Sequence, residues 1–224
     1  MSNTIYNASI NRFLHQQDRI AEYMIFFNSA LENNSIENKN VLEKIGQFHI
    51  EIVIVSLYSF FEEFLKSIIF TATVHNVDLA KNFFINRPKD LEKINKCKSL
   101  PEVGHYLQEK VNFGKKAKTL KKLFKHLFNF PLFPDDQTEK VIFDFNLVRT
   151  IITHDGGWPS EEQFKRIKTE GTISLSNEIK FGDKTHNFYK LNFLNGKFIK
   201  SIYLAVNSIV SNIKKNSGVQ IEIK

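Results

Sequence analysis

Cysteine is nearly absent from the 224-residue chain, and glycine and proline are scarce. Cys97 is the only cysteine, so no disulfide bond can form within the chain. This favours a reducing compartment and predicts a cytoplasmic protein. The nine glycines and five prolines are few for a fold that turns often. Their scarcity disfavours an all-β fold and favours helices joined by a small number of turns.

Long hydrophobic runs are missing too. The most apolar stretch, Ile50–Phe70, is interrupted by three glutamates and a lysine, whereas a membrane-spanning helix needs about 20 mostly apolar residues. The first residues, Met1–Thr4, lack the basic region and apolar stretch that are typical of a secretory signal. We therefore expect a buried helix across Ile50–Phe70 and no membrane partner.

The sequence also lacks motifs for metals and nucleotide phosphates. It has no His-x-x-x-His pair, no paired cysteines and no carboxylate triplet at calcium-loop spacing. No glycine-rich loop opens a helix after a strand. Lysines surround Cys97, but no histidine lies near it in the sequence to activate a thiolate. The sequence predicts no metal site and no cofactor.

Aromatic and basic residues are plentiful by contrast. Hydrophobic residues make up 42% of the chain and include 22 phenylalanines, which is enough for a sizeable, aromatic-rich core in one domain. The net charge is +7 at pH 7. This basic balance is compatible with an anionic partner.

Apolar residues recur at helical spacing through most of the chain, so the predicted fold class is all-α. The predicted helices span Tyr6–Leu31, Asn40–Val74, Asp78–Phe84, Lys89–Lys96, Pro101–Lys110, Gly114–Phe128, Asp136–Asp155, Ser160–Lys168 and Leu191–Ile213. Alternating residues predict a small β-hairpin insert at about 170–190, with strands at Thr172–Ser176, Glu178–Phe181 and Asn187–Lys190. The expected architecture is a single domain, 1–224, built as an up-and-down helical bundle with this insert.

The predicted helix Gly114–Phe128 has one apolar face and one lysine face. The lysine face consists of Lys118, Lys121, Lys122 and Lys125. One interpretation is an ordinary solvated surface, which is the usual role of such a run. The other is a strip that contacts RNA phosphates, which the single sign of the charge favours and which would add affinity without sequence choice.

The stretch Phe143–Gly157 is too polar on one side for an ordinary amphipathic helix. Val141, Phe145, Val148 and Ile152 make its apolar stripe, while the opposite arc carries Asn146, Arg149, Thr150, Thr153 and His154 without any Lys or Glu. Asp136 and Glu139 have the spacing of an N-terminal capping box, and Gly156 with Gly157 predicts a left-handed end. A histidine in the last turn can take and give a proton near neutrality.

Arg149, four intervening residues, His154 and the trailing Asp155-Gly156-Gly157 resemble the signature of HEPN-domain ribonucleases. In that family an Arg, a polar residue, a few mostly apolar residues and a His stand near the end of a helix in an all-helical domain. The resemblance implies a HEPN-like fold and a metal-independent endoribonuclease. It further implies a homodimer that brings two motifs into one cleft, and an antitoxin or other defence-system protein as a further partner.

The resemblance also implies a role for each site residue. Arg149 would bind the phosphate and His154 would transfer protons, with Asn146 and Thr150 orienting the pair or the substrate. An acidic residue of the long preceding helix would touch Arg149, and Glu62 is the predicted one; pairing with a lysine or exposure to solvent is its alternative role. The family usually has Asn or another strongly polar residue after the Arg, where this chain has Thr150, a weaker hydrogen-bonding group. A non-catalytic module that binds RNA or a protein therefore stays open as a second hypothesis.

Overall fold

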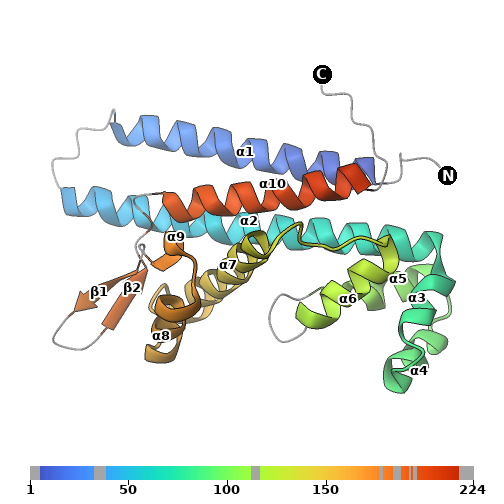
Figure 1. The fold of residues 1–224 in the computed structure, drawn as a ribbon. Coiled ribbons are helices and arrows are strands. Elements are labelled where there is room, and N and C mark those ends of the chain that lie inside the picture. The colour runs from blue at the N-terminus through green and yellow to red at the C-terminus, as the bar shows by residue number, and fades with distance from the viewer. Residues whose placement is uncertain are drawn as a thin grey trace. The chain divides into compact units, whose positions relative to one another are not determined.

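A computed structural model of the chain is mostly helical (Figure 1) and describes residues 6–32, 39–111, 117–176, 179–183, 188–191, 193 and 196–216. The helices are α1 (Asn7–Glu32), α2 (Lys39–His75), α3 (Val77–Phe83), α4 (Pro88–Lys96), α5 (Leu100–Gln108), α6 (Ala117–Phe128), α7 (Asp136–Asp155), α8 (Glu161–Glu170), α9 (Ile173–Ser176) and α10 (Lys197–Asn216). Strands β1 (Ile179–Asp183) and β2 (Phe188–Leu191) pair antiparallel, with an irregularity between Phe181 and Asp183. The predicted all-α class is confirmed. Of the helices in these ranges, none has the length and apolar content needed to cross a membrane.

The chain divides into two compact units. Unit 1 comprises Met1–Phe13, Phe61–Pro134 and Ser208–Lys224, and unit 2 comprises Leu14–Phe60 and Asp135–Asn207. The boundaries fall within α1, α2 and α10, so each of these helices contributes one part to each unit. Over the printed sequence, unit 1 contains 18 Lys and Arg against 8 Asp and Glu, whereas unit 2 contains 13 against 16. The excess positive charge of the chain therefore belongs to unit 1.

Unit 1 has the aromatic core that the phenylalanine content predicts. Phe13 of α1 is fully buried against α2, where its ring is stacked 4.9 Å from that of Phe64 and lies 6.2 Å from that of Phe61. Gly104 lies against the Phe70 ring, and a Cβ at position 104 would approach that ring to 2.5 Å. The glycine therefore allows α5 to pack more closely on α2 than any other residue could.

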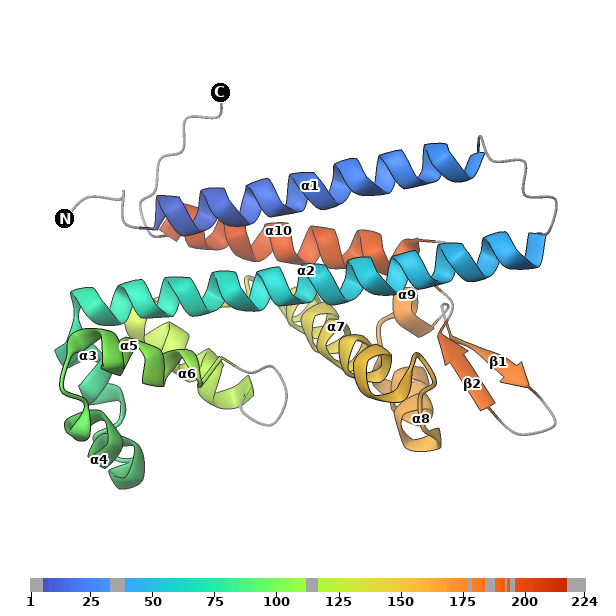
Figure 2. The same cartoon turned by 180° about the vertical axis from the view of Figure 1, so that it is seen from behind.

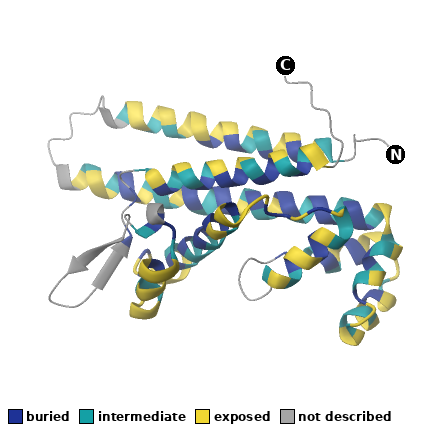
Figure 3. Ribbon diagram, viewed as in Figure 1, coloured by how far each residue is buried: buried dark blue, intermediate teal, exposed yellow. Residues whose placement is uncertain are grey.

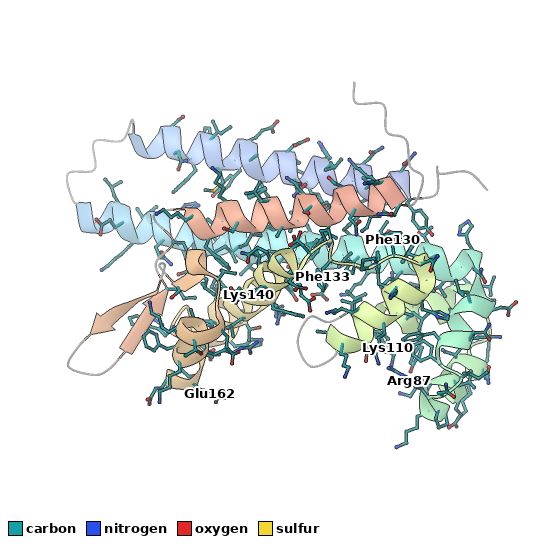
Figure 4. The ribbon with its side chains drawn as sticks, in the orientation of Figure 1. Arg87, Lys110, Phe130, Phe133, Lys140 and Glu162 are labelled. Atoms are coloured by element: carbon teal, nitrogen blue, oxygen red, sulfur yellow. The ribbon has the colours of Figure 1, made fainter. Side chains whose placement is uncertain are left out.

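A polar cluster joins α4 to the end of α5 in unit 1. Lys110 forms an ion pair with Asp90 at 2.8 Å, and the Tyr106 hydroxyl donates to the same carboxylate. Burial alone would raise the pKa of Asp90, but the hydrogen bonds from Lys110 and Tyr106 outweigh it and lower that pKa. Arg87, labelled with Lys110 in Figure 4, adds a second positive charge near Asp90. The polar groups of the cluster satisfy one another, and their hydrogen bonds hold α4 against the end of α5.

In unit 2, the C-terminal part of α1 runs beside the N-terminal part of α2, and α7 passes obliquely across α2 (Figures 1 and 2). The residues of α7 are mostly buried or half-buried, whereas α8 is largely exposed (Figure 3). Val141, Phe145, Val148 and Ile151 are at most 4% exposed. Val141, Phe145 and Val148 of the predicted stripe therefore lie on the packed side of the helix, whereas Ile152 is only half-buried.

Two predictions for the segment after α8 are wrong. Residues Ile173–Ser176 form the short helix α9 instead of a strand, because the Thr172 side chain accepts a hydrogen bond from the Leu175 N–H and the Thr172 carbonyl accepts one from Ser176. The last helix begins at Lys197 rather than Leu191, since Leu191 belongs to β2 and Gly196 adopts a left-handed φ of +66°. Parts of the predicted strands Glu178–Phe181 and Asn187–Lys190 lie outside the described residues.

A buried carboxylate accounts for the conformation of this segment. Asp144 of α7 is 7% exposed and accepts a hydrogen bond at 2.7 Å from the Thr172 backbone N–H. Burial raises the pKa of Asp144, although the hydrogen bonds from Thr172 and the positive charges of Lys140 and Arg166 act in the opposite direction. A neutral side chain at position 144 would therefore be easier to bury than the ionised one.

The raised pKa of Asp144 predicts how stability changes with pH. Its contribution to the free energy of unfolding is largest below the ordinary aspartate pKa of about 3.9, and it falls as pH rises through the higher pKa of the folded state. Asp144→Asn keeps an oxygen for Thr172 but does not titrate. In urea unfolding at several pH values, wild type should lose stability relative to Asp144→Asn as pH rises from about 4. A difference that is constant with pH would contradict this.

Tyr203 of α10 offers a second test of buried polar groups in unit 2. Its hydroxyl oxygen is buried and has no hydrogen-bond partner in the described part of the chain, and burial raises its pKa to about 12. Tyr203→Phe removes only this unsatisfied hydroxyl, so it should raise the free energy of unfolding by about 1 kcal/mol in urea unfolding at neutral pH. A loss of stability would mean that the hydroxyl is hydrogen-bonded in solution.

Candidate functional site

Helix α7 carries Arg149 and His154, and both of its ends are capped. The N-cap is Asp135, whose carboxylate accepts a hydrogen bond from the Thr138 N–H at 2.6 Å. The predicted cap at Asp136 is wrong by one residue, because Asp136 already has helical backbone. At the other end Gly156 and Gly157 have φ of +58° and +84°, which confirms the predicted left-handed end.

The Arg149 side chain packs on Tyr58 of α2. The guanidinium carbon lies 5.5 Å from the centroid of the Tyr58 ring. The Nε atom of Arg149 is buried without a hydrogen-bond partner, and no carboxylate in the described part of unit 2 forms an ion pair with this side chain. Buried donors and buried charges are normally paired. Arg149 therefore has unused capacity for an anion or another acceptor.

Tyr58 also contacts two neighbours of Arg149 on α7. Its hydroxyl donates to Oδ1 of Asn146 at 2.7 Å, and its ring meets that of Phe145 edge-on at 5.1 Å. Tyr58 is 3% exposed and Phe145 is fully buried. Because Asn146 and Arg149 both rest on Tyr58, the structure brings these two predicted site residues together.

Thr150 directs its hydroxyl at its own helix. The Thr150 side chain donates to the Asn146 carbonyl at 2.9 Å, and Thr153 likewise donates to the Arg149 carbonyl at 2.9 Å. Such bonds to the preceding turn are a common arrangement for threonine within helices. The proton of Thr150 is therefore directed at the helix backbone, and its predicted role in orienting the pair or the substrate stays a prediction.

His154 is exposed in the last turn of α7. It lies five positions after Arg149, which corresponds to about 7.5 Å along the helix axis and about 140° around it. No hydrogen bond joins His154 to another residue that the structure describes. Its neighbour Asp155 accepts a hydrogen bond from Gln163 of α8 at 3.1 Å. Within one chain, then, the arginine and the histidine stand at opposite edges of the polar arc.

The sequence did not single out a group of polar residues on α2 that lies at the end of α7. The buried Gln47 donates to Glu51 at 2.6 Å and to the Leu191 carbonyl at 3.1 Å, and accepts from the Phe193 N–H at 3.0 Å. The Glu51 carboxylate adjoins Gly157, because a Cβ at position 157 would lie 3.2 Å from Oε1. Gln47, Glu51 and Tyr58 repeat at helical intervals of four and seven residues, which is the signal that could have identified this face.

The remaining predicted site residues belong to unit 1. Glu62 forms an ion pair with Lys66 at 2.6 Å, which is the alternative role considered for it, and its predicted contact with Arg149 stays a prediction. The four lysines of the strip on α6 are all exposed: Lys118, Lys121, Lys122 and Lys125. Lys121 also lies 6.0 Å from the Phe133 ring centroid, and none of the other three forms an ion pair with a described carboxylate.

Three other kinds of feature could indicate a functional site, and none of them involves Arg149 or His154 in the described residues. A cavity of about 440 Å³ lies between α1 and α2 in unit 2, with Arg19, Tyr23 and Phe60 in its lining. Cys97 donates to the Lys93 carbonyl at 3.4 Å in unit 1. Within the described ranges, no group of three or more His, Cys, Asp and Glu side chains is arranged to hold a metal ion.

Comparisons of the chain with protein-family models, with curated proteins and with solved structures gave no match. Any functional conclusion therefore depends on the residues of this chain and their geometry.

Proposed function

We propose that the protein is a metal-independent endoribonuclease of the HEPN type, with its catalytic residues on α7. The observation that carries the proposal is the state of Arg149. This arginine is half-buried, rests on an aromatic ring, has an unpaired Nε and forms no ion pair with a described carboxylate of unit 2. A guanidinium held in this way is suited to bind a phosphate through paired N–H donors.

The reaction needs an anion-binding group and two proton transfers. The 2′-hydroxyl of a ribose attacks the adjacent phosphorus and loses its proton to a base, while an acid protonates the departing 5′-oxygen. The P–O5′ bond breaks, and the products are a 2′,3′-cyclic phosphate and a 5′-hydroxyl. Arg149 would offset the charge that gathers on the non-bridging oxygens. His154, exposed and without a hydrogen-bond partner among the described residues, would serve as base or acid.

A homodimer follows from this chemistry, because one imidazole cannot easily act as base and acid in the same step. A second copy of α7 would add a second arginine and a second histidine to a shared cleft. The exposed position of His154 at the end of α7 is compatible with this arrangement. In the proposed fold, β1 and β2 form the hairpin insert of a HEPN-like bundle.

RNA affinity would come mainly from unit 1. Its excess of ten positive charges over the printed sequence and the exposed lysines of α6 are the electrostatic features that attract a polyanion. We assign the enzyme to the cytoplasm on the evidence of its single cysteine. A toxin–antitoxin or phage-defence role, with an inhibitory partner protein, is the cellular role that the motif suggests.

A second candidate function is a non-catalytic module of the same fold that binds RNA or a protein. The observation that favours it is the Thr150 hydroxyl, which donates to the helix backbone where the resembling family usually presents an asparagine to the site. Such a module would keep the phosphate-binding arginine and lose the cleavage.

Variants at the two motif residues test the enzyme against the binding module. Wild type should cleave mixed RNA in EDTA and leave 2′,3′-cyclic phosphate ends. Arg149→Ala should slow cleavage by about a hundredfold or more through loss of charge stabilisation. His154→Ala should slow it by about 10²-fold to 10⁴-fold through loss of proton transfer. Rates and product ends are measured on gels and by mass spectrometry, with circular dichroism to check folding.

Two matched controls come from unit 2. Arg166 and His15 are also exposed, so Arg166→Ala and His15→Ala should cleave at the wild-type rate. Cleavage that survives in both motif variants would reject α7 as the catalytic helix. A wild type that binds RNA in a salt-sensitive manner but never cuts it would support the binding module instead.

The lysine strip has a separate test by salt titration. Replacing Lys118, Lys122 and Lys125 by Ala should weaken RNA binding and reduce the slope of log affinity against log salt by about 2, since each lost contact to a single strand removes roughly 0.7. Fluorescence anisotropy at several salt concentrations measures both quantities. The control removes the same charge from exposed lysines of unit 2, Lys140, Lys165 and Lys200. An equal effect in the control would mean that net charge matters and the strip does not.

A further inference from the structure

We propose that Tyr58 is a positioning residue, which holds the Asn146 amide so that its NH₂ group and the Arg149 guanidinium form a two-donor site for the oxygens of one RNA phosphodiester. The identity of the ligand rests on the proposed function. The arrangement of the donors rests on the contacts of Tyr58 alone.

The orientation of the Asn146 amide is the first step. An asparagine side chain accepts hydrogen bonds through Oδ1 and donates them through Nδ2. Oδ1 accepts the Tyr58 hydroxyl proton at 2.7 Å, so the acceptor end of the amide faces α2. The donor end then faces away from Tyr58, and Nδ2 has no hydrogen-bond partner among the described residues of unit 2. Without the tyrosine hydroxyl, the amide could turn over and present its oxygen instead.

The second step is the rigidity of Tyr58. Its side chain is 3% exposed, and its ring lies edge-on to the fully buried Phe145 at 5.1 Å. A buried ring in such a contact has little freedom to move. The hydroxyl is therefore held in one place, where it donates to Oδ1 of Asn146 and favours one orientation of the amide.

The Tyr58 ring also positions the guanidinium of Arg149. Arg149 covers the Tyr58 ring with its guanidinium carbon 5.5 Å from the ring centroid, a contact of the cation–π type. Stacking of this kind uses the face of the planar group and leaves its N–H edges for hydrogen bonds. One phenol therefore orients both candidate donors, Arg149 by its ring and Asn146 by its hydroxyl.

The spacing of the donors and their chemistry indicate the ligand. Asn146 and Arg149 are three residues apart, so their side chains leave the same side of α7 about 5–6 Å apart at Cβ. A phosphodiester has two non-bridging oxygens that accept hydrogen bonds and share one negative charge. The amide NH₂ of Asn146 and the Arg149 guanidinium are both hydrogen-bond donors, and such a pair selects an anion of this kind over a cation or a neutral donor.

The test measures binding rather than cleavage, so that it does not depend on the enzyme activity. The probe is a short, labelled 2′-O-methyl RNA, which has no free 2′-hydroxyl to attack, and the full-length protein is titrated by fluorescence anisotropy. Tyr58→Phe keeps the ring and removes the hydroxyl, so the affinity should fall about threefold to tenfold, as expected for the loss of one positioned hydrogen bond. Tyr203→Phe, which removes another buried hydroxyl of unit 2, is the matched control and should bind like wild type.

A double-mutant cycle separates positioning from packing. If Tyr58 acts through the amide, Tyr58→Phe should weaken binding in the wild-type background and have no further effect in Asn146→Ala. A purely structural loss would be the same in both backgrounds. Asn146→Asp can still accept the Tyr58 proton but turns a charged oxygen toward the phosphate, so it should weaken binding more than Asn146→Ala does.

The outcomes distinguish this inference from the proposed function. Wild-type affinity in Tyr58→Phe, additive effects in the cycle, or no binding of the probe by wild type would each overturn the role of Tyr58. If cleavage depends on Arg149 and His154 while Tyr58→Phe binds normally, the ribonuclease stands and the inference fails. If the cycle is non-additive but no RNA is ever cut, the anion site stands and the catalytic function fails.

Discussion

Tyr58 contacts three residues within two turns of α7: its ring lies beside Phe145, its hydroxyl binds Asn146, and its face supports Arg149. Because these residues occupy successive positions around one side of the helix, the contacts determine how α7 is rotated about its axis relative to α2. An aromatic pair and a charge-stacking contact each contribute about 0.5–1.5 kcal/mol beyond simple burial. The rotation sends Arg149 toward α2 and leaves His154 at the exposed edge, so every chemical role considered for this helix depends on it.

The structural features that the sequence predicts are those that neighbouring residues of the chain determine. The apolar stripe of α7 is buried at Val141, Phe145 and Val148. Apolar residues at helical spacing form one side of an amphipathic helix, and that side packs against the core. Gly156 and Gly157 end the helix in the left-handed conformation that other residues rarely adopt. Even here the N-cap was displaced by one residue, since Asp135 and Asp136 are chemically equal caps and only the backbone of the folded chain decides between them.

What could not be predicted depends on residues distant in sequence. Thr172–Ser176 has the alternation of a strand, but the buried Asp144, 28 residues earlier, binds the Thr172 N–H and the segment closes into a helical turn. No local pattern in the sequence carries that information. The spacing of Glu51 and Tyr58 indicates that they share one face of α2, but their contacts with α7 appear only in the folded structure. Glu62 is the predicted acidic residue because it follows the aromatic pair Phe60-Phe61; it forms an ion pair with Lys66 of the same helix, and its contact with Arg149 stays a prediction.

The two units differ in charge, and the proposed function gives them different tasks. Unit 1 holds the excess positive charge of the chain, while unit 2, which contains Arg149, has slightly more acidic than basic residues. Long-range attraction of a polyanion is screened within about 10 Å at moderate salt, whereas a half-buried guanidinium with unpaired donors is much less screened. In the proposed ribonuclease, the affinity of unit 1 for RNA should therefore be sensitive to salt, and the proposed contact of Arg149 and Asn146 with a single phosphate should be much less so. Because the proposed attraction and the proposed chemistry reside on different residues, a mutation could remove one and retain the other, and so convert the proposed enzyme into the proposed binding module.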